Sequence, residues 1–287
     1  MRAPSPTVHG MLWMTATGVL FCLMNAILKK VSHELEPWVV GWLRYSLGAL
    51  VMLPAALRAR ALWPRRPGLQ ALRGGFHAGG LILWFVALPM ISLAEMTAIG
   101  FSGPIFICLG AVLVLGERMS LARWAAVLAG FGGVLLIVRP WDGGVGAVSA
   151  GTLLLLAATP VLSAGFLVAK VLTRHDRPET IVLWQHLWVA VLMAPLALAR
   201  WTPPSAGQWA LLVVTGFLGA GGHYCSARAF RVADISAVQS VRFLDLVWAS
   251  LLGVAIFGTV PEGWTVAGGA VILLSTLWLA RREARGT

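Results

Sequence analysis

The sequence predicts an all-α membrane protein with ten transmembrane helices, built as a five-plus-five inverted repeat with both termini in the cytoplasm. Three observations support this prediction. Apolar residues make up 59% of the 287 residues and charged residues only 11%, Gly, Pro and charged residues divide the chain into ten apolar segments, and the two halves of the chain resemble each other. An ordinary soluble domain carries about 25% charged residues. The composition therefore excludes a soluble or disordered chain.

The apolar segments are helical because only helices and closed barrels satisfy their backbone hydrogen bonds inside a bilayer. Barrel strands alternate in polarity over about 10 residues, whereas residues 81–91 and 125–138 are apolar on every face. A helix needs about 20 residues to span the bilayer. The predicted spans are 10–28, 38–57, 72–89, 92–115, 121–138, 149–170, 180–199, 208–228, 234–257 and 263–280. The longest connection, 58–71, is basic and holds two prolines, so we expect a surface loop there.

The net charge of +11 follows the predicted topology. If the N-terminus is cytoplasmic, 16 of the 22 Lys and Arg residues fall on its side, four fall on the opposite side, and Arg44 and Arg242 lie within spans. This bias is typical of cytoplasmic loops. It predicts cytoplasmic termini and a lipid bilayer, not a nucleic acid, as the partner of the basic residues.

The two halves align without gaps at an offset of 142 residues from the first span to the end of the fourth. The matched pairs include Trp42 with Trp184, Gly74 with Gly216, Gly80 with Gly222, and Phe101 with Phe243. The alignment predicts one five-helix repeat over residues 1–143 and a second over 144–287. Because five is odd, the second repeat enters the membrane from the opposite side, and such inverted repeats are typical of transporters.

The sequence contains no recognisable catalytic motif. It has no HExxH, no GxSxG, no phosphate-binding loop, and no pair of carboxylates at helical spacing within one span. The cysteines and histidines form no metal-ligand spacing either. We therefore expect neither enzyme activity nor a metal or other cofactor.

Several short motifs, in a fixed order, resemble the EamA-type repeat of the drug/metabolite transporter superfamily. They are Arg44 to Ala49, Phe85 to Leu88, Ser92 to Pro104, Leu115 to Ser120, Gly132 to Leu136, Ala227 to Phe230, and Phe257-Gly258 with Trp264. One departure is Thr259, where the family often has Glu after Gly. The resemblance implies a ten-helix carrier of the bacterial inner membrane. Members of the superfamily export amino acids and related metabolites or take up S-adenosylmethionine. Within the superfamily, this chain is most similar to aromatic amino acid exporters.

Residues that share helix faces near the middle of the predicted spans are candidates for substrate binding. His77, Gly80 and Trp84 share one face of the third span, and Thr97, Phe101 and Pro104 share one face of the fourth. The repeat offset places Ser226, Gln239 and Phe243 on an opposing wall, with His223 and Tyr224 beside it. Two interpretations stay open, a cavity wall for a small-molecule substrate or ordinary core packing around small residues.

Charged residues within spans are candidates for ion coupling or for a structural ion pair. Arg44 lies in the second span, Glu95 near one end of the fourth, and Arg242 and Asp245 three residues apart in the ninth. We expect alternating access around a site at mid-membrane, with facilitated diffusion and proton antiport both open. The competing class is a channel or a structural membrane subunit, although the chain shows no ring of like charges. The oligomeric state stays open.

Overall fold

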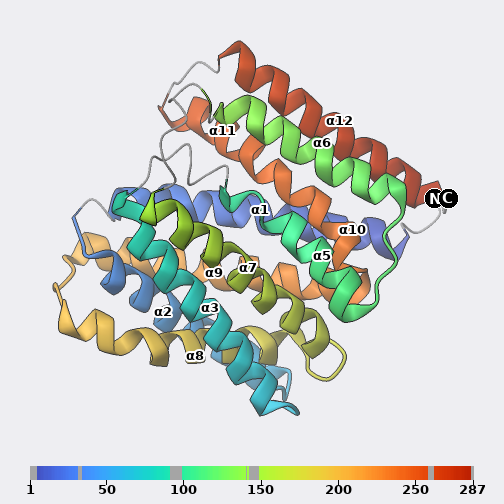
Figure 1. Ribbon diagram of the computed structural model, residues 1–287. Helices are drawn as coiled ribbons and strands as arrows, with labels where there is room; N and C mark the ends of the chain where they lie inside the picture. The colour runs from blue at the N-terminus through green and yellow to red at the C-terminus, as the bar shows by residue number, and fades with distance from the viewer. Residues whose placement is uncertain are drawn as a thin grey trace.

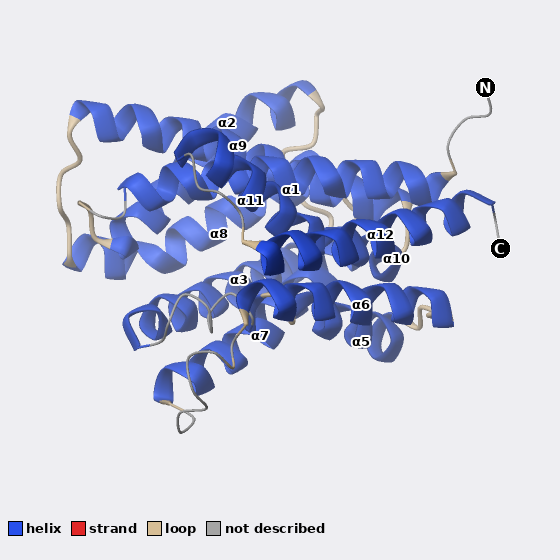
Figure 2. Cartoon of the chain, turned by 90° about the horizontal axis from the view of Figure 1, so that it is seen from above, coloured by secondary structure: helices blue, strands red, loops and turns tan. Residues whose placement is uncertain are grey.

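The structure, a computed structural model, describes residues 5–31, 34–90, 99–139, 141, 149–257 and 262–285. Within these ranges helices are the only regular secondary structure (Figure 2). The helices are α1 (Pro6–Val31), α2 (Pro37–Arg58), α3 (Pro67–Ala87), η1 (Leu88–Met90), α5 (Gly103–Leu115), α6 (Leu121–Val138), α7 (Ala150–Leu172), α8 (Pro178–Ala199), α9 (Ala206–Val232), α10 (Ile235–Gln239), η2 (Ser240–Phe243), α11 (Leu244–Phe257) and α12 (Gly263–Arg285).

Eight candidate membrane spans are long and apolar enough to cross a bilayer, counted over the described ranges. They are α1, α2, α6, α7, α8, α9, α12 and the stretch Ile235–Leu252; α5 is a shorter apolar helix. Helix α3 has the required length, but its buried Gln70, Arg73 and His77 make it less apolar. The prediction of an all-helical membrane protein is thus confirmed for the described residues, whereas ten spans and cytoplasmic termini stay predictions.

The outer surface is apolar and the interior holds polar side chains, as expected for a protein surrounded by lipid. Leu113 is 81% exposed and Leu274 is 67% exposed, although both belong to helices. Gln70, Gln185 and His186 are buried. The outward-facing side chains are therefore apolar, like the hydrocarbon of the bilayer, and these polar side chains are buried inside.

Three predicted elements differ from the structure. In the fourth predicted span, 92–115, a turn at residues 101–102 precedes α5, which begins at Gly103. Helix α3 begins at Pro67, so the loop after α2 covers 59–66 and not 58–71; proline suits the first turn of a helix, and Arg73 is accommodated because it is buried against a backbone carbonyl. The ninth predicted span, 234–257, is divided into α10, the 3₁₀ turn η2 and α11. No proline or glycine marks that break in the sequence.

Helices of the two halves pack against each other in a two-fold pattern (Figure 1). Helix α1 packs along α9, and α7, its counterpart at the 142-residue offset, packs along α3, the counterpart of α9. Helix α2 packs on its own counterpart α8, and α6 packs on its counterpart α12. Exchanging the halves therefore leaves the set of main helix contacts unchanged.

Both ends of the chain lie on one side of the molecule, which we call the terminal face (Figure 1). Ser5 donates a hydrogen bond to the backbone oxygen of Glu283, and the side chain of Glu283 pairs with Arg123 at the start of α6. Arg123 also pairs with Asp234, and the Lys170 ammonium near the end of α7 contacts the preceding carbonyl of Ala233. Helix α1 therefore begins at the face where α7 ends, so these two helices run in opposite directions.

The interior helices form two groups. Helices α3 and α5 pack on α7, and we call these three the α7 group. Helices α9, α10 and α11 pack on α1 and form the α1 group. Helix α8 packs on α3 and on α9, and α2 packs on α9 and contacts α3 through the side chains of Tyr45 and Trp38. Helices α2 and α8 therefore bridge the two groups.

Candidate functional site

The centre of the molecule holds a cluster of one tyrosine and three histidines, which we call the imidazole centre: Tyr45, His77, His186 and His223. Their rings lie close together, with centroids 5.5 Å apart for His77 and His223 and 5.4 Å apart for His186 and His223. The Tyr45 hydroxyl and His77 Nε2 are 2.6 Å apart and hydrogen-bonded. All four side chains are buried. Buried imidazole and phenol groups at membrane depth are costly and mark a candidate functional site.

Four helices supply the imidazole centre, one residue each from α2, α3, α8 and α9. Because α2 and α3 belong to the first half and α8 and α9 to the second, the centre lies where the two halves meet. His186 Nδ1 is hydrogen-bonded to the Val182 carbonyl one turn earlier in α8. That bond fixes the His186 ring. Within the described ranges, no group of three or more His, Cys, Asp or Glu side chains is arranged to hold a metal ion.

Two arginines beside the imidazole centre lack a carboxylate partner among the described residues. The Arg44 guanidinium lies 4.3 Å from the Tyr45 ring centroid and contacts Met24 Sδ at 3.3 Å. Arg73 is buried and donates a hydrogen bond of 2.6 Å to the Ile181 carbonyl in α8. Unpaired cations at membrane depth attract anionic groups. The centre is therefore suited to a solute that carries a carboxylate or another negative group.

Arg242 and Asp245 form an ion pair with an Nε to Oδ2 distance of 3.0 Å, at the break between η2 and α11. Gly18 of α1 makes room for this pair, since a Cβ there would overlap the Asp245 carboxylate. The Arg242 guanidinium also lies 5.8 Å from the Phe21 ring and 6.0 Å from the Phe166 ring.

Phe21 and Phe166 connect this ion pair to the imidazole centre. The Phe21 ring lies 5.0 Å from His223, and the Phe166 ring lies 6.4 Å from His77. Phe21 belongs to α1 and Phe166 to α7, so each of the two helix groups contributes one of these rings. The site is thus a band of rings with hydrogen-bonding nitrogens and oxygens on one side and an ion pair on the other.

Several buried polar atoms in the helices around the site have no hydrogen-bond partner among the described residues. They include His223 Nδ1, Gln185 Oε1, both amide atoms of Gln239, and the indole nitrogens of Trp188 and Trp248. Leaving a buried polar group unsatisfied costs about 1–3 kcal/mol. Such groups therefore offer hydrogen bonds to a polar solute or to water in the interior.

Some predicted site residues lie in or beside this centre. His77 and His223 are two of its four members, and Arg44, Arg242 and Asp245 lie beside it as described above. Gln239 is buried in α10, directly before the η2 turn that carries Arg242.

Other predicted residues take part in helix packing. Gly80 allows Leu162 of α7 to pack closely on α3, and Trp84 packs in a separate cluster near Ala87. Phe101 stacks on its offset counterpart Phe243 with ring centroids 6.5 Å apart.

The remaining predicted residues lie away from the four rings or outside the described part of the chain. Pro104 is buried in the first turn of α5, and Ser226 lies 3.5 Å from the Thr17 hydroxyl between α9 and α1. Tyr224 donates to Glu179 near the terminal face. Thr97 and Glu95 lie outside the described residues.

Sequence reasoning did not single out Tyr45, His186, Phe21 or Phe166. One signal could have found His186, because it occupies the position 142 residues after Arg44, which was singled out as a charge within a span. Tyr45, Phe21 and Phe166 carry no such signal. Phe21 and Phe166 have apolar sequence neighbours, and Tyr45 lies directly after Arg44 in an otherwise apolar span. An aromatic residue in an apolar helix is more often part of the core.

At the terminal face the two helix groups are joined by charged side chains and backbone groups, an arrangement that we call the terminal clamp. Glu117, directly after α5, accepts hydrogen bonds from Ile235 N, Ser236 N and Ser236 Oγ at 3.0, 3.1 and 2.7 Å. Lys170 of α7 donates to the carbonyls of Phe230 and Ala233 at the end of α9. An anion thus meets free amide groups at the start of α10, and a cation meets free carbonyls at the end of α9.

The chain was compared with protein families and with known proteins and structures. Residues 8–139 and 149–281 each match the EamA-like transporter family. A riboflavin transporter of Rhizobium johnstonii is 34% identical, covering 98% of this chain and 94% of that protein. A riboflavin transporter of Vibrio cholerae is 32% identical, covering 97% and 95%. An S-adenosylmethionine uptake transporter of Rickettsia prowazekii is 24% identical, covering 97% and 94%. A solved structure titled only as the crystal structure of a protein aligns with a TM-score of 0.83 at 21% identity, covering 95% of this chain and 98% of that one.

Proposed function

Because the chain belongs to the EamA-like transporter family, we propose that it is a secondary transporter that binds a planar heteroaromatic solute of the riboflavin type at the imidazole centre. The observation that carries this proposal is the band of rings at the meeting point of the two halves, Tyr45, His77, His186 and His223 with Phe21 and Phe166. The relatives named as riboflavin transporters support the same solute class.

The chemistry of the centre suits such a solute. Aromatic rings at 4.5–7 Å centroid separation favour stacked or edge-on contacts, and a flat heterocycle offers both faces and several hydrogen-bonding edges. The His223 Nδ1 atom and the Gln239 amide have unused hydrogen-bonding capacity. A site of this kind, apolar rings with a few polar groups, is the usual form of a small-molecule site.

A second solute class is favoured by a different observation. Arg44 and Arg73 have no carboxylate partner among the described residues, and a solute carboxylate would supply one. This supports the expectation of amino acid export, and S-adenosylmethionine, which carries a carboxylate, belongs to the same class. Competition between these solutes separates the two hypotheses.

We further propose that residues 1–143 and 144–287 are inverted repeats that exchange conformations around the imidazole centre, in the inner membrane of a bacterial cell. The opposite directions of α1 and α7 and the two-fold contact pattern support this arrangement. Two antiparallel copies of one unit can open a central site to either side in turn. A channel or a structural subunit has no need for such symmetry.

In this mechanism the terminal clamp holds the terminal face closed. The clamp charges do not recur in the other repeat, since Thr259 and Leu28 occupy the positions that correspond to Glu117 and Lys170. The symmetric exchange between the two open states is therefore biased, and the closed terminal face is favoured at rest. If Asp245 releases a proton during the cycle, transport is proton antiport. If Asp245 only pairs with Arg242, transport is facilitated diffusion.

Counterflow in proteoliposomes tests the proposal. Vesicles loaded with unlabelled riboflavin should accumulate labelled riboflavin, and excess amino acids should not compete. Tyr45→Phe removes the hydroxyl that bonds His77, so we expect the half-saturation concentration to rise about tenfold, as for the loss of about 1.4 kcal/mol. Trp209→Phe, at an exposed position on α9, is the matched control. Saturable counterflow of amino acids without riboflavin counterflow would replace the proposed solute, and no counterflow of any solute would reject the transporter.

A further inference from the structure

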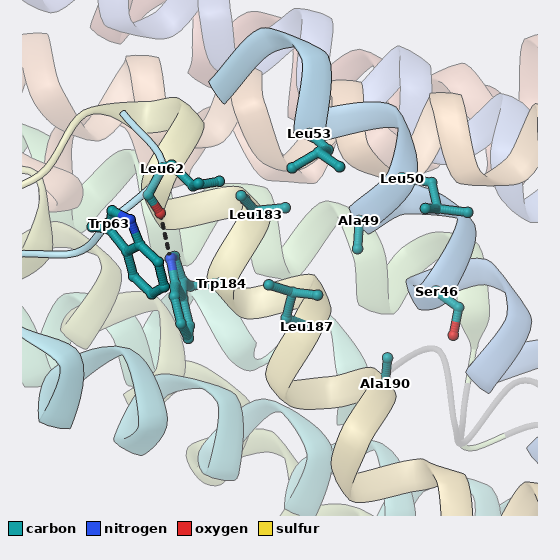
Figure 3. A pocket seen from close by; sticks show the side chains of 10 residues that line it. All are labelled: Ser46, Ala49, Leu50, Leu53, Leu62, Trp63, Leu183, Trp184, Leu187 and Ala190. Atoms are coloured by element: carbon teal, nitrogen blue, oxygen red, sulfur yellow. Dashed lines mark hydrogen bonds between the residues drawn. The ribbon is translucent and has the colours of Figure 1, made fainter. Parts of the chain in front are cut away.

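An apolar groove lies between α2 and α8 on the outer surface of the protein, toward the terminal face (Figure 3). It encloses about 470 Å³. Ser46 is the single hydroxyl-bearing side chain among the lining residues, and Leu50, Leu53 and Leu187 line the groove while remaining exposed. The groove is open on its outer side, where the membrane surrounds the protein. Its lining therefore has the chemistry that an acyl chain prefers.

Two tryptophans mark one end of the groove (Figure 3). This end lies toward the terminal face, because Trp184 is in the second turn of α8, which begins shortly after the end of α7. The Trp63 and Trp184 rings lie 6.1 Å apart, and Trp184 Nε1 donates a hydrogen bond of 2.8 Å to the Leu62 carbonyl. Trp63 is 77% exposed. Tryptophan is enriched where hydrocarbon meets lipid headgroups. The groove is thus at the depth of the acyl chains, and the loop 59–66 is at the depth of the headgroups.

Three side chains at the start of α8 hold the loop 59–66 over the end of the groove by hydrogen bonds. Arg177, Thr180 and Trp184 follow helical spacing and each donates to a backbone carbonyl of the loop. The acceptors are the carbonyls of Ala59, Ala61 and Leu62. The Arg177 guanidinium is consequently held next to the chain segment that carries Arg58 and Arg60.

The loop and Arg177 form a positive cluster at the groove. Arg58, Arg60 and Arg177 are exposed, and none of them pairs with a carboxylate among the described residues. The two nearby carboxylates are used elsewhere, since Asp176 accepts hydrogen bonds from the Arg65 amide and the Gln70 side chain and Glu179 accepts one from a tyrosine.

The backbone of Arg60 adds a further observation. Arg60 has a φ of 49°, a left-handed conformation that ordinarily favours glycine. Arg60 lies between Ala59 and Ala61, whose carbonyls accept the hydrogen bonds from Arg177 and Thr180, so this turn is held in place at the groove.

We propose that the α2–α8 groove and the cluster of Arg58, Arg60 and Arg177 form a binding site for an anionic phospholipid from the leaflet at the terminal face. One acyl chain lies in the groove, and the guanidinium groups bind the phosphate, which they can contact through two donors at once. Because α2 comes from the first half and α8 from the second, the bound lipid bridges the two halves. The site does not depend on which solute the protein carries.

Native mass spectrometry of the full chain released from nanodiscs tests this site. We expect phosphatidylglycerol to be retained in preference to phosphatidylcholine. Each Arg or Lys near an anionic surface contributes enough attraction for about a fivefold change in binding, so Arg58→Gln with Arg60→Gln should lower the retention of phosphatidylglycerol roughly 30-fold. Ser46→Phe fills the groove and should lower retention while leaving the arginines intact. The matched control is Arg118→Gln with Arg281→Gln, which removes two exposed charges elsewhere on the terminal face.

Four outcomes would overturn the proposal. Equal retention of both phospholipids, or an equal loss in the control variant, would show that no specific anionic site exists. Displacement of phosphatidylglycerol by soluble glycerol phosphate would show that the groove takes no part. A change of oligomeric mass in Ser46→Phe would identify the groove as a contact between copies of the chain. Because the measurement requires no transport, its failure is separate from a failure of the proposed function.

Discussion

The terminal clamp makes a quantitative prediction about the resting conformation. Glu117 accepts three hydrogen bonds from the start of α10, and a hydrogen bond to a charged group contributes about 1.5–3 kcal/mol. Glu117→Gln keeps one acceptor oxygen and removes the charge, so we count the loss of about one such bond, or about 2 kcal/mol. Since 1.4 kcal/mol corresponds to a factor of ten, the ratio of closed to open terminal face should fall roughly 30-fold.

Spin-label distances measure this ratio directly. Labels at the exposed positions 118 and 231 report on the two sides of the clamp, after the native cysteines are replaced. The wild type should show one short distance, Glu117→Gln a second and longer one, and the double variant with Lys170→Met mostly the longer one. Glu34→Gln is the matched control, since Glu34 accepts a hydrogen bond from Gln208 at the face opposite the termini.

Two results would contradict the proposed role of the terminal clamp. If both clamp variants keep the single short distance while remaining folded, the charges do not hold the face closed. If Glu34→Gln lengthens the distance as much as Glu117→Gln does, the change reflects general loosening of the fold and not the release of the clamp.

Two further predictions concern stability, measured as thermal unfolding in detergent. Asp245→Asn removes one partner of an ion pair whose side chains are 23% and 13% exposed, so it should destabilise the protein by about 3 kcal/mol. The double variant with Arg242→Gln should regain most of that loss. A double variant no more stable than the single one would contradict the pairing. Gly130→Ala would place a Cβ against the Phe243 ring and should destabilise the protein by about 1–3 kcal/mol. The Cβ of Gly132→Ala would lie in open space, so this substitution should stabilise the helix by up to about 1 kcal/mol. Equal effects of the two substitutions would contradict the packing.

Part of the site was predictable from the sequence. Charges within an apolar segment are visible without a structure, so the sequence singled out Arg44, Arg242 and Asp245, which lie beside the candidate site, and helical spacing singled out His77. The choice among face-sharing residues was less informative, because Gly80 and Phe243 suit helix packing as well as they suit a cavity wall. Helical spacing identifies residues on one face of one helix and does not say which helix that face contacts.

The alignment of the two halves carried information about the fold beyond the spans themselves. It paired Phe101 with Phe243, and these two rings stack on each other. A residue and its counterpart are close only when they lie near the symmetry axis, and the sequence does not say where that axis passes. Most matched pairs, such as Gly80 and Gly222, instead contact different side chains, Leu162 and Phe21.

The sequence by itself determined that this is a helical membrane protein, because the cost of polar groups in lipid acts on every residue of a span and affects the composition. The transporter family came from the resemblance of its short motifs to the EamA-type repeat. Only the tertiary structure decided that Tyr45 meets His186 and His223, and that the span 234–257 breaks at η2. These contacts join helices from different halves, and their geometry depends on how each helix is rotated and packed against the others. No spacing within a single helix records that rotation.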